Sequence, residues 1–209
     1  MQQPVDYQLA DTADLARGWL SEHAAGAGIV AVDTETTGWD PLRDRLLLVQ
    51  VSAGPDRPVL VLDAQRVDPL VLQPLFADEQ ALKVFHHGAF DLRFLSMAGL
   101  RVRRVADTML AQQLLDGGES TEAGLGLAGL ADFRLGMRLD KTVRDTFQDP
   151  GQADPTEQQL AYAAADAAAT WGVFDQQWRE LVGHGLTRVA QLEFAALPVL
   201  AAMQLRGVA

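Results

Sequence analysis

The order of its apolar segments constrains the fold of this chain more than any other feature. Three short apolar segments, at residues 28–34, 45–52 and 58–62, follow one another with only short links between them, which predicts an antiparallel meander of strands. After residue 82, short apolar segments alternate instead with segments of helical period. This alternation implies crossover connections onto parallel strands. The sequence therefore predicts an α/β fold in which helices flank a mixed central sheet.

Helices and further strands are expected along the rest of the chain. The helices are predicted at residues 11–24, 68–77, 88–98, 107–115, 156–181 and 187–205, and the strands at 82–86 and 101–106. Residues 116–154 are rich in Gly and Asp and predict only short helical pieces. Because the break at 183–185 contains glycine, we expect one domain over residues 1–185 and a C-terminal helix within 186–209.

Composition narrows the classes of function. The chain has no cysteine, which excludes disulfides and thiolate metal sites. Its net charge is −11, whereas proteins that hold nucleic acid by its phosphates are mostly basic. Tight binding to nucleic acid would therefore need divalent cations among the acidic residues, or a second domain or chain. The N-terminus lacks the pattern of a signal peptide, and no apolar stretch approaches the ~18 residues that span a bilayer, so we expect a cytoplasmic protein without membrane association.

Two carboxylates end the first predicted strand. Asp33 and Glu35 are two residues apart, so the period of a strand places both on one face. The strand is otherwise apolar, and charged residues at the end of a core strand are costly unless they are solvated, paired or bound to metal. Their mutual repulsion favours a bound cation. The alternative is a solvent-exposed strand end that leads into a turn at Thr37 and Gly38.

Three further residues carry groups that suit the same chemistry. Asp91 lies early in the predicted helix 88–98, where the helix dipole alone would also favour a carboxylate. Tyr162 and Asp166 are one turn apart on the predicted helix 156–181 and share a face. Most of their neighbours are alanines, so another element can pack closely against them. A small packing face explains the alanines but not the carboxylate that lies on it.

In combination these residues resemble the DEDD superfamily of 3′–5′ exonucleases, in the branch that contains a tyrosine. The resemblance extends from about residue 28 to residue 178. It rests on D-x-E at the first strand, F-D on a helix after a later strand, and Y-x-x-x-D on a long late helix. It implies an enzyme that hydrolyses phosphodiester bonds and a ribonuclease H-like fold, with residues 1–185 as the exonuclease domain.

The resemblance further implies two divalent cations, Mg²⁺ or Mn²⁺, held by four carboxylates. Asp33 would bridge the two ions, and Glu35 and Asp166 would bind one of them. Asp91 would bind the other ion, partly through water. Two such ions ~3.5–4 Å apart activate a water molecule and relieve the charge that develops in phosphodiester cleavage. Tyr162 would orient the attacking water through its hydroxyl.

Contacts to substrate are implied by the same resemblance. The segment VDTETTG resembles the first motif of proofreading domains in family A (DNA polymerase I-like) polymerases, in which an apolar residue at the position of Trp39 wedges between the last two bases. The residues expected to contact substrate are Thr34, Thr36, Trp39, His87, Phe90 and Lys141. Trp39 is alternatively a packed turn residue, and Lys141 is alternatively a solvated surface residue. Arg144 is a weaker candidate for a phosphate contact.

Two neighbouring features have simpler explanations. The pair His86 and His87 suggests zinc, but no third ligand follows at a spacing typical of zinc sites. DNA polymerase I-like proteins commonly carry an Asn before F-D that contacts substrate, whereas residues 86–89 here read HHGA. His87 could donate to a phosphate or sugar instead. Asp107 is explained by an N-cap role in the helix that follows it.

Three functions remain open from the sequence. The favoured one is proofreading of DNA, because the tail LEFAALPVLAAMQLRGVA resembles the helix that leads from exonuclease to polymerase in family A enzymes. Residues 186–209 would then begin the linkage to a polymerase domain, in the same chain or in trans. The segments LDKTVRDTF and PTEQQLAYAAADA also resemble ribonuclease D, which makes RNA the alternative substrate. In both cases the partner is the 3′ end of a single strand. The third function is a catalytically silent docking module, against which the five signature residues argue.

Overall fold

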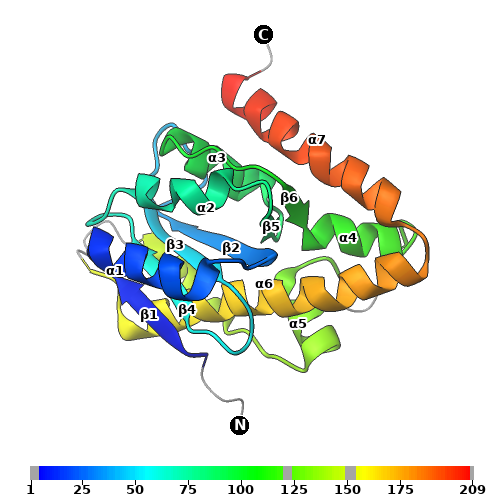
Figure 1. Cartoon of the computed structure of the whole chain (residues 1–209), viewed down its shortest axis with the longest axis horizontal. Helices are drawn as coiled ribbons and strands as arrows, with labels where there is room; N and C mark the ends of the chain where they lie inside the picture. Colours follow the sequence, from blue (N-terminus) through cyan, green and yellow to red (C-terminus); the bar gives the residue numbers. More distant parts are fainter. Residues whose placement is uncertain (1–4, 120–123, 149–153, 208–209) are drawn as a thin grey trace.

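A six-stranded sheet forms the centre of the molecule (Figure 1). The structure is a computed structural model that describes residues 5–119, 124–148 and 154–207. The strands are β1 (Tyr7–Ala10), β2 (Ile29–Thr36), β3 (Leu46–Ser52), β4 (Val59–Asp63), β5 (Leu82–Phe85) and β6 (Val105–Asp107). They lie in the order β1-β4-β3-β2-β5-β6, in which β2–β3 and β3–β4 are antiparallel and the other pairs are parallel. The predicted meander and the predicted parallel crossovers are therefore both confirmed.

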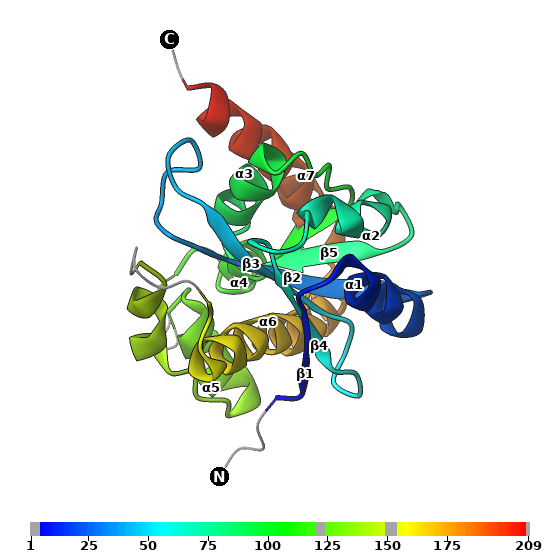
Figure 2. The same cartoon turned by 90° about the vertical axis from the view of Figure 1, so that its left-hand side faces the viewer.

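Helices cover both faces of this sheet. The helical segments are α1 (Ala13–Trp19), η1 (Leu20–Ala24), η2 (Pro69–Leu72), α2 (Gln73–Ala77), α3 (Ala89–Met97), α4 (Thr108–Leu115), α5 (Leu127–Leu135), η3 (Lys141–Gln148), α6 (Glu157–Gly183) and α7 (Thr187–Arg206). One face carries α1, α2 and α3, and the other carries α6 (Figures 1 and 2). The C-terminal helix α7 packs on α3 and β6. Across the described ranges, we find no helix with both the length and the apolar character of a membrane span.

Three segments differ from the sequence-based prediction. Strand β1 was not predicted, because its four residues are too few to show an alternating pattern. It forms by parallel pairing with β4. The strand predicted at 101–106 is limited to β6, since Arg104 before it has a φ of 48°, which is incompatible with an extended strand. The helix predicted at 11–24 is α-helical only to Trp19 and continues as the π-helical segment η1.

Small side chains allow α6 to lie close to the sheet. Ala163, Ala164 and Ala167 are fully buried in the layer between α6 and the meander strands. At the start of the helix, the Thr156 hydroxyl accepts a hydrogen bond from the Gln159 N–H, and the Gln159 side chain accepts one from the Thr156 N–H. This capping box fixes where α6 begins, and therefore which of its residues face the end of β2.

The turn from β5 into α3 is held by a carboxylate of the next strand. His87 lies in the left-handed region with a φ of 59°, and the Gly88 N–H donates to Asp107 Oδ2 at 2.6 Å. The other oxygen of Asp107 accepts hydrogen bonds from the N–H groups of Met109 and Leu110. The predicted N-cap role of Asp107 is thus confirmed, and this one side chain joins the starts of α3 and α4.

We expect Gly88→Ala to destabilise the protein, because a Cβ at this position would lie 2.5 Å from Phe85 Cβ. Relieving such an overlap in a packed region costs about 1–3 kcal/mol. Denaturant unfolding of the variant and the wild type would measure the loss. Gly28→Ala is the matched control and should be close to neutral, since no described atom beyond its chain neighbours lies within 4 Å of its Cβ position. Equal stability of the two variants would contradict the tight fit assigned to this turn.

Candidate active site

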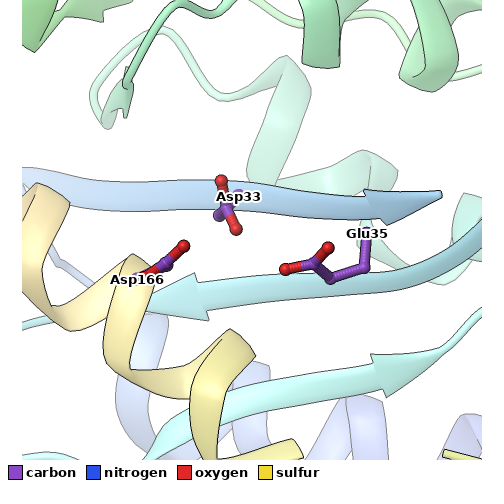
Figure 3. A group of neighbouring side chains, drawn as sticks. All are labelled: Asp33, Glu35 and Asp166. Atoms are coloured by element: carbon purple, nitrogen blue, oxygen red, sulfur yellow. The ribbon is translucent and has the colours of Figure 1, made fainter. Parts of the chain in front are cut away.

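The acidic residues predicted to act together meet in one cleft. Asp33 and Glu35 extend from β2, Asp166 from α6, and Asp91 from the first turn of α3. Carboxylate oxygens of Asp33, Glu35 and Asp166 all lie within 4.8 Å of one another (Figure 3). All four carboxylates and Tyr162 line a cleft of about 320 Å³. Folding therefore gathers side chains from three distant segments of the chain.

The register of the sheet orients the two carboxylates of β2. Asp33 is paired with Gln50 of β3, and Glu35 is paired with Leu48. Leu48 packs beneath α6, so this register places both carboxylates on the face that α6 covers. Directly after Glu35 the register shifts, and the regular ladder to β3 is interrupted. Such an irregularity bends a strand and changes the direction of the side chains beside it.

Thr34 connects β2 to α3 from the opposite face of the strand. Its hydroxyl donates to Asp91 Oδ1 at 2.6 Å, and both side chains are buried. This bond fixes the Asp91 carboxylate relative to the strand that carries Asp33. Thr34 also lines the cleft, where the sequence predicted a contact to substrate.

Burial and mutual repulsion raise the pKa of the carboxyl groups in the cleft. For Asp33 and Glu35 burial is the larger cause, and the neighbouring carboxylates add to it, so both pKa values lie well above the usual range. Burial raises the pKa of Asp91 to about 7, although the hydrogen bond from Thr34 acts in the opposite direction. The cleft therefore holds its negative charge at a free-energy cost unless a cation is present.

Tyr162 and Asp166 interact across one turn of α6. Burial raises the pKa of Asp166 to about 6, and a hydrogen bond to Tyr162 limits the rise. Burial also raises the pKa of the Tyr162 hydroxyl, and the charge of Asp166 raises it further. Tyr162 therefore keeps its proton at neutral pH. It can orient a bound molecule by hydrogen bonding, but it is a poor base.

The donor set fits a divalent cation. The three clustered ligands offer hard carboxylate oxygens, which suit Mg²⁺ and Mn²⁺. Asp166 Oδ1 is buried and has no hydrogen-bond partner among the described residues, so this carboxylate still needs a donor or a cation. Asp91 lies outside this cluster of three, but its charge raises the pKa of Asp33. In the part of the chain that the structure describes, no histidine belongs to the cluster, although His86 and His87 line the cleft.

Aromatic and cationic side chains form the mouth of the cleft. Trp39 is 60% exposed, and its ring contacts that of Phe90 with 5.6 Å between the centroids. The guanidinium of Arg144 lies 4.9 Å from the centroid of the Trp39 ring, within the range of a cation–π interaction. Lys141 lines the cleft from η3, the segment that also carries Arg144. The positive charge of Arg144 lowers the pKa of Asp33, so Arg144 is close enough to stabilise negative charge in the acidic cluster.

Three smaller groups complete the lining. Thr36 lines an adjoining pocket of about 30 Å³, and its hydroxyl donates to the Gly38 carbonyl at 2.7 Å. His87 lines the main cleft and is exposed. No substrate role was predicted for His86. The structure places its Nδ1 at 2.8 Å from Thr108 Oγ1, and burial lowers the pKa of His86 to about 4. His86 is therefore a neutral imidazole in the wall of the cleft.

A family model described as 3′–5′ exonuclease matches residues 7–182. The match spans all six strands and contains every acidic residue of the cleft, together with Tyr162. The chain belongs to the 3′–5′ exonuclease family. The protein is therefore an enzyme, and the predicted membership of the DEDD superfamily is confirmed.

Relatives of the exonuclease fall into two groups. It is 28% identical over 208 residues to DNA polymerase I of Chloroflexus aurantiacus, in an alignment that covers 90% of this chain and 21% of the polymerase. It is 33% identical over 171 residues to ribonuclease D of Nitrobacter hamburgensis, in an alignment that covers 79% of this chain and 42% of the relative. The exonuclease thus spans less than half the length of either relative.

Solved structures agree with the fold. NrnC of Brucella melitensis with bound Mg²⁺ is 27% identical and superposes with a TM-score of 0.78, over 98% of this chain and 95% of NrnC. NrnC bound to pGG is similar with a TM-score of 0.76 at 29% identity, over 90% of this chain and 89% of NrnC. The mixed sheet with its flanking helices is the ribonuclease H-like fold, as predicted.

We expect the exonuclease without added metal to lose stability as the pH rises from about 5 to about 8. The folded pKa values of Asp91, about 7, and Asp166, about 6, lie above the unfolded value of ~3.9. The folded state therefore binds more protons in this range, and that stabilisation is lost as the pH passes the folded values. The Tm should fall along the series, and Mg²⁺ should restore it at the alkaline end.

Asp33→Asn is the control for this titration. It removes one of the repelling charges, so both the pH dependence and the response of the Tm to Mg²⁺ should become smaller. A wild-type Tm that does not respond to Mg²⁺ at about pH 8 would contradict a cation site in this cleft.

Proposed function

We propose that the exonuclease removes nucleotides from the 3′ end of a single nucleic-acid strand by hydrolysis at two divalent cations, Mg²⁺ or Mn²⁺. The main support for this proposal is the acidic cluster. One carboxylate oxygen from each of Asp33, Glu35 and Asp166 lies within 4.8 Å of the others, and the buried Asp91 lies beside them. Like charges at this distance require a counter-charge. The Mg²⁺ bound to NrnC, which matches nearly the whole chain, supports the use of cations here.

Roles for the individual side chains follow from their positions. Three carboxylates raise the pKa of Asp33, namely Asp91, Glu35 and Asp166, so Asp33 is the group best placed to bridge two ions. Glu35 and Asp166 would bind one ion and Asp91 the other. Bound cations would supply an activated water and charge relief on the leaving oxygen. Tyr162, which keeps its proton, would orient that water.

The mouth of the cleft suits a single strand. Trp39 is 60% exposed at the mouth of the cleft and is the aromatic ring on which a base would stack, with about 1–3 kcal/mol. Phe90 packs against it. Lys141 and Arg144 would face the phosphates from η3. The remaining proposed contacts to the terminal nucleotide are Thr34, Thr36 and His87. Stacking is independent of base identity, so we expect little sequence preference.

We propose DNA as the favoured substrate and proofreading for a family A polymerase as the role. The alignment to DNA polymerase I supports this proposal, because it covers 90% of the chain. Helix α7 buries Phe194 and Leu197 against the domain but leaves Leu192, Val199 and Met203 exposed. Residues 186–209 would thus begin the linkage to a polymerase domain in the same chain, or contact one in trans.

Ribonuclease D-like trimming of RNA is the second candidate. The 33% identity to ribonuclease D and the similarity to NrnC bound to pGG favour it. A catalytically silent docking module is less well supported, because Asp33, Glu35, Asp91, Tyr162 and Asp166 all line the cleft.

Matched DNA and RNA oligonucleotides would separate the two substrates. We expect DNA labelled at its 5′ end to shorten in single-nucleotide steps with Mg²⁺ or Mn²⁺, and to do so faster than RNA of the same sequence. Gel electrophoresis resolves the products. A circular single strand should stay intact because it has no 3′ end, and its cleavage would be incompatible with an exonuclease. Faster loss of the RNA would move the assignment to the second candidate.

Two substitutions test the assigned chemistry. Asp33→Ala should abolish cleavage and leave the fold intact, because it removes one charge from a repelling cluster. Tyr162→Phe should slow cleavage by about 10²-fold or more and leave metal affinity unchanged. Tyr7→Phe on β1 is the matched control, and its activity should equal that of the wild type. A folded Asp33→Ala protein with normal activity would refute the bridging role.

A further inference from the structure

Gln50 is buried beside the acidic cluster. It lies on β3, is 0% exposed, and is paired across the strands with Asp33 on one side and Val61 on the other. Side chains of residues paired in this way project from the same face, with Cβ atoms ~4.5–5.5 Å apart. The Gln50 side chain therefore lies next to Asp33, in the layer that α6 covers.

Neither amide atom of Gln50 has a hydrogen-bond partner among the residues that the structure describes. Leu48 and Val61, its neighbours on this face, are apolar and fully buried. An unpaired amide in such surroundings costs about 1–3 kcal/mol, whereas an apolar side chain of the same shape would cost nothing. Most buried polar groups in folded proteins are paired, so this amide needs an explanation.

Two further unpaired polar atoms lie on α6. Asp166 Oδ1 and Thr170 Oγ1 are both buried, are one helical turn apart, and have no partner within the described ranges. Together with Gln50 they make two donors, the amide Nε2 and the Thr170 hydroxyl, and two acceptors, Gln50 Oε1 and Asp166 Oδ1. Because α6 packs directly on β2 and β3, the four atoms belong to one layer of the core. Donor and acceptor atoms are thus equal in number, but none of the four is paired in the structure.

We propose that Gln50 is a positioning residue for the metal-binding carboxylates, and that Thr170 holds its amide in place. When a cation is bound, the Thr170 hydroxyl donates to Gln50 Oε1, and Gln50 Nε2 donates to the Asp166 oxygen that does not bind the ion. Without a cation these hydrogen bonds are not formed. A donor at that oxygen fixes the direction of the carboxylate and strengthens the binding of the cation. The inference rests on the proposed two-metal function and adds the side chains that orient its ligands.

Gln50→Leu tests the proposal, because it nearly preserves the volume and removes both amide atoms. Without metal, its stability should equal or exceed that of the wild type, since an unpaired buried amide is lost. The Kd for Mn²⁺, measured by titration calorimetry without nucleic acid, should rise about 10–100-fold. Cleavage should be recovered at high Mn²⁺ concentration, which a general loss of structure would not allow.

Gln177→Leu is the matched control. Gln177 is equally buried on α6, but its Nε2 donates to the Thr108 carbonyl at 2.9 Å and to Gln112 Oε1 at 3.0 Å. This variant should lose stability and keep the wild-type Kd for Mn²⁺. Thr170→Val removes only the hydroxyl and should weaken Mn²⁺ binding in the same direction as Gln50→Leu. If Gln50→Leu does not fold, the Kd of Thr170→Val for Mn²⁺ is sufficient to test the positioning role.

Wild-type affinity for Mn²⁺ in the folded Gln50→Leu and Thr170→Val variants would overturn the positioning role. In that case the wild type would still bind Mn²⁺ and cleave, and the proposed function would stand. A wild-type protein that binds no Mn²⁺ would refute both the function and this inference. The titration of the wild type therefore distinguishes the two failures.

Discussion

Electrostatic repulsion between four carboxyl groups is the constraint on which the rest of this structure depends. Burial and mutual charge raise the pKa values of Asp33 and Glu35, so the cluster opposes its own assembly. The free energy that holds it together comes from apolar contacts elsewhere. Val30 and Val32 of β2 are fully buried in the core, and burial of such a side chain contributes about 1.5–3 kcal/mol. Packing of the apolar core thus holds the four carboxyl groups in position, and a bound cation would offset the repulsion between them.

Hydrogen bonds, rather than ion pairs to arginines or lysines, hold the carboxylates in place. Thr34 donates to Asp91, and Asp107 fixes the turn that leads to Asp91 through the Gly88 N–H. Among the described residues, none of the ion pairs includes a carboxylate of the cluster. Arg144 acts on Asp33 only through its field from the mouth of the cleft. A direct ion pair would compete with a metal for the same oxygens, so this arrangement keeps the ligands available.

The parts of the site that could be predicted from the sequence are those set by the period of one strand or one helix. Asp33 and Glu35 are separated by one strand period, and Tyr162 and Asp166 by one helical turn, so the sequence alone places each pair on a face. The meander and the long helix α6 were predictable for the same reason. Contacts between distant elements were not. The pairing of β1 with β4 depends on tertiary structure, and so does the position of Gln50, a polar residue in a mostly apolar strand.

The negative charge of the chain can also be understood from the site. A net charge of −11 disfavours binding to duplex or single strands over the general surface. The cleft offers local positive charge, because Lys141 and Arg144 lie on one short segment beside the exposed ring of Trp39. Neutralisation of the carboxylates by cations would make the potential in the cleft favourable for a phosphate. Binding of a strand and readiness for hydrolysis would then depend on the same ions, so a strand end would be held chiefly where it can be cleaved.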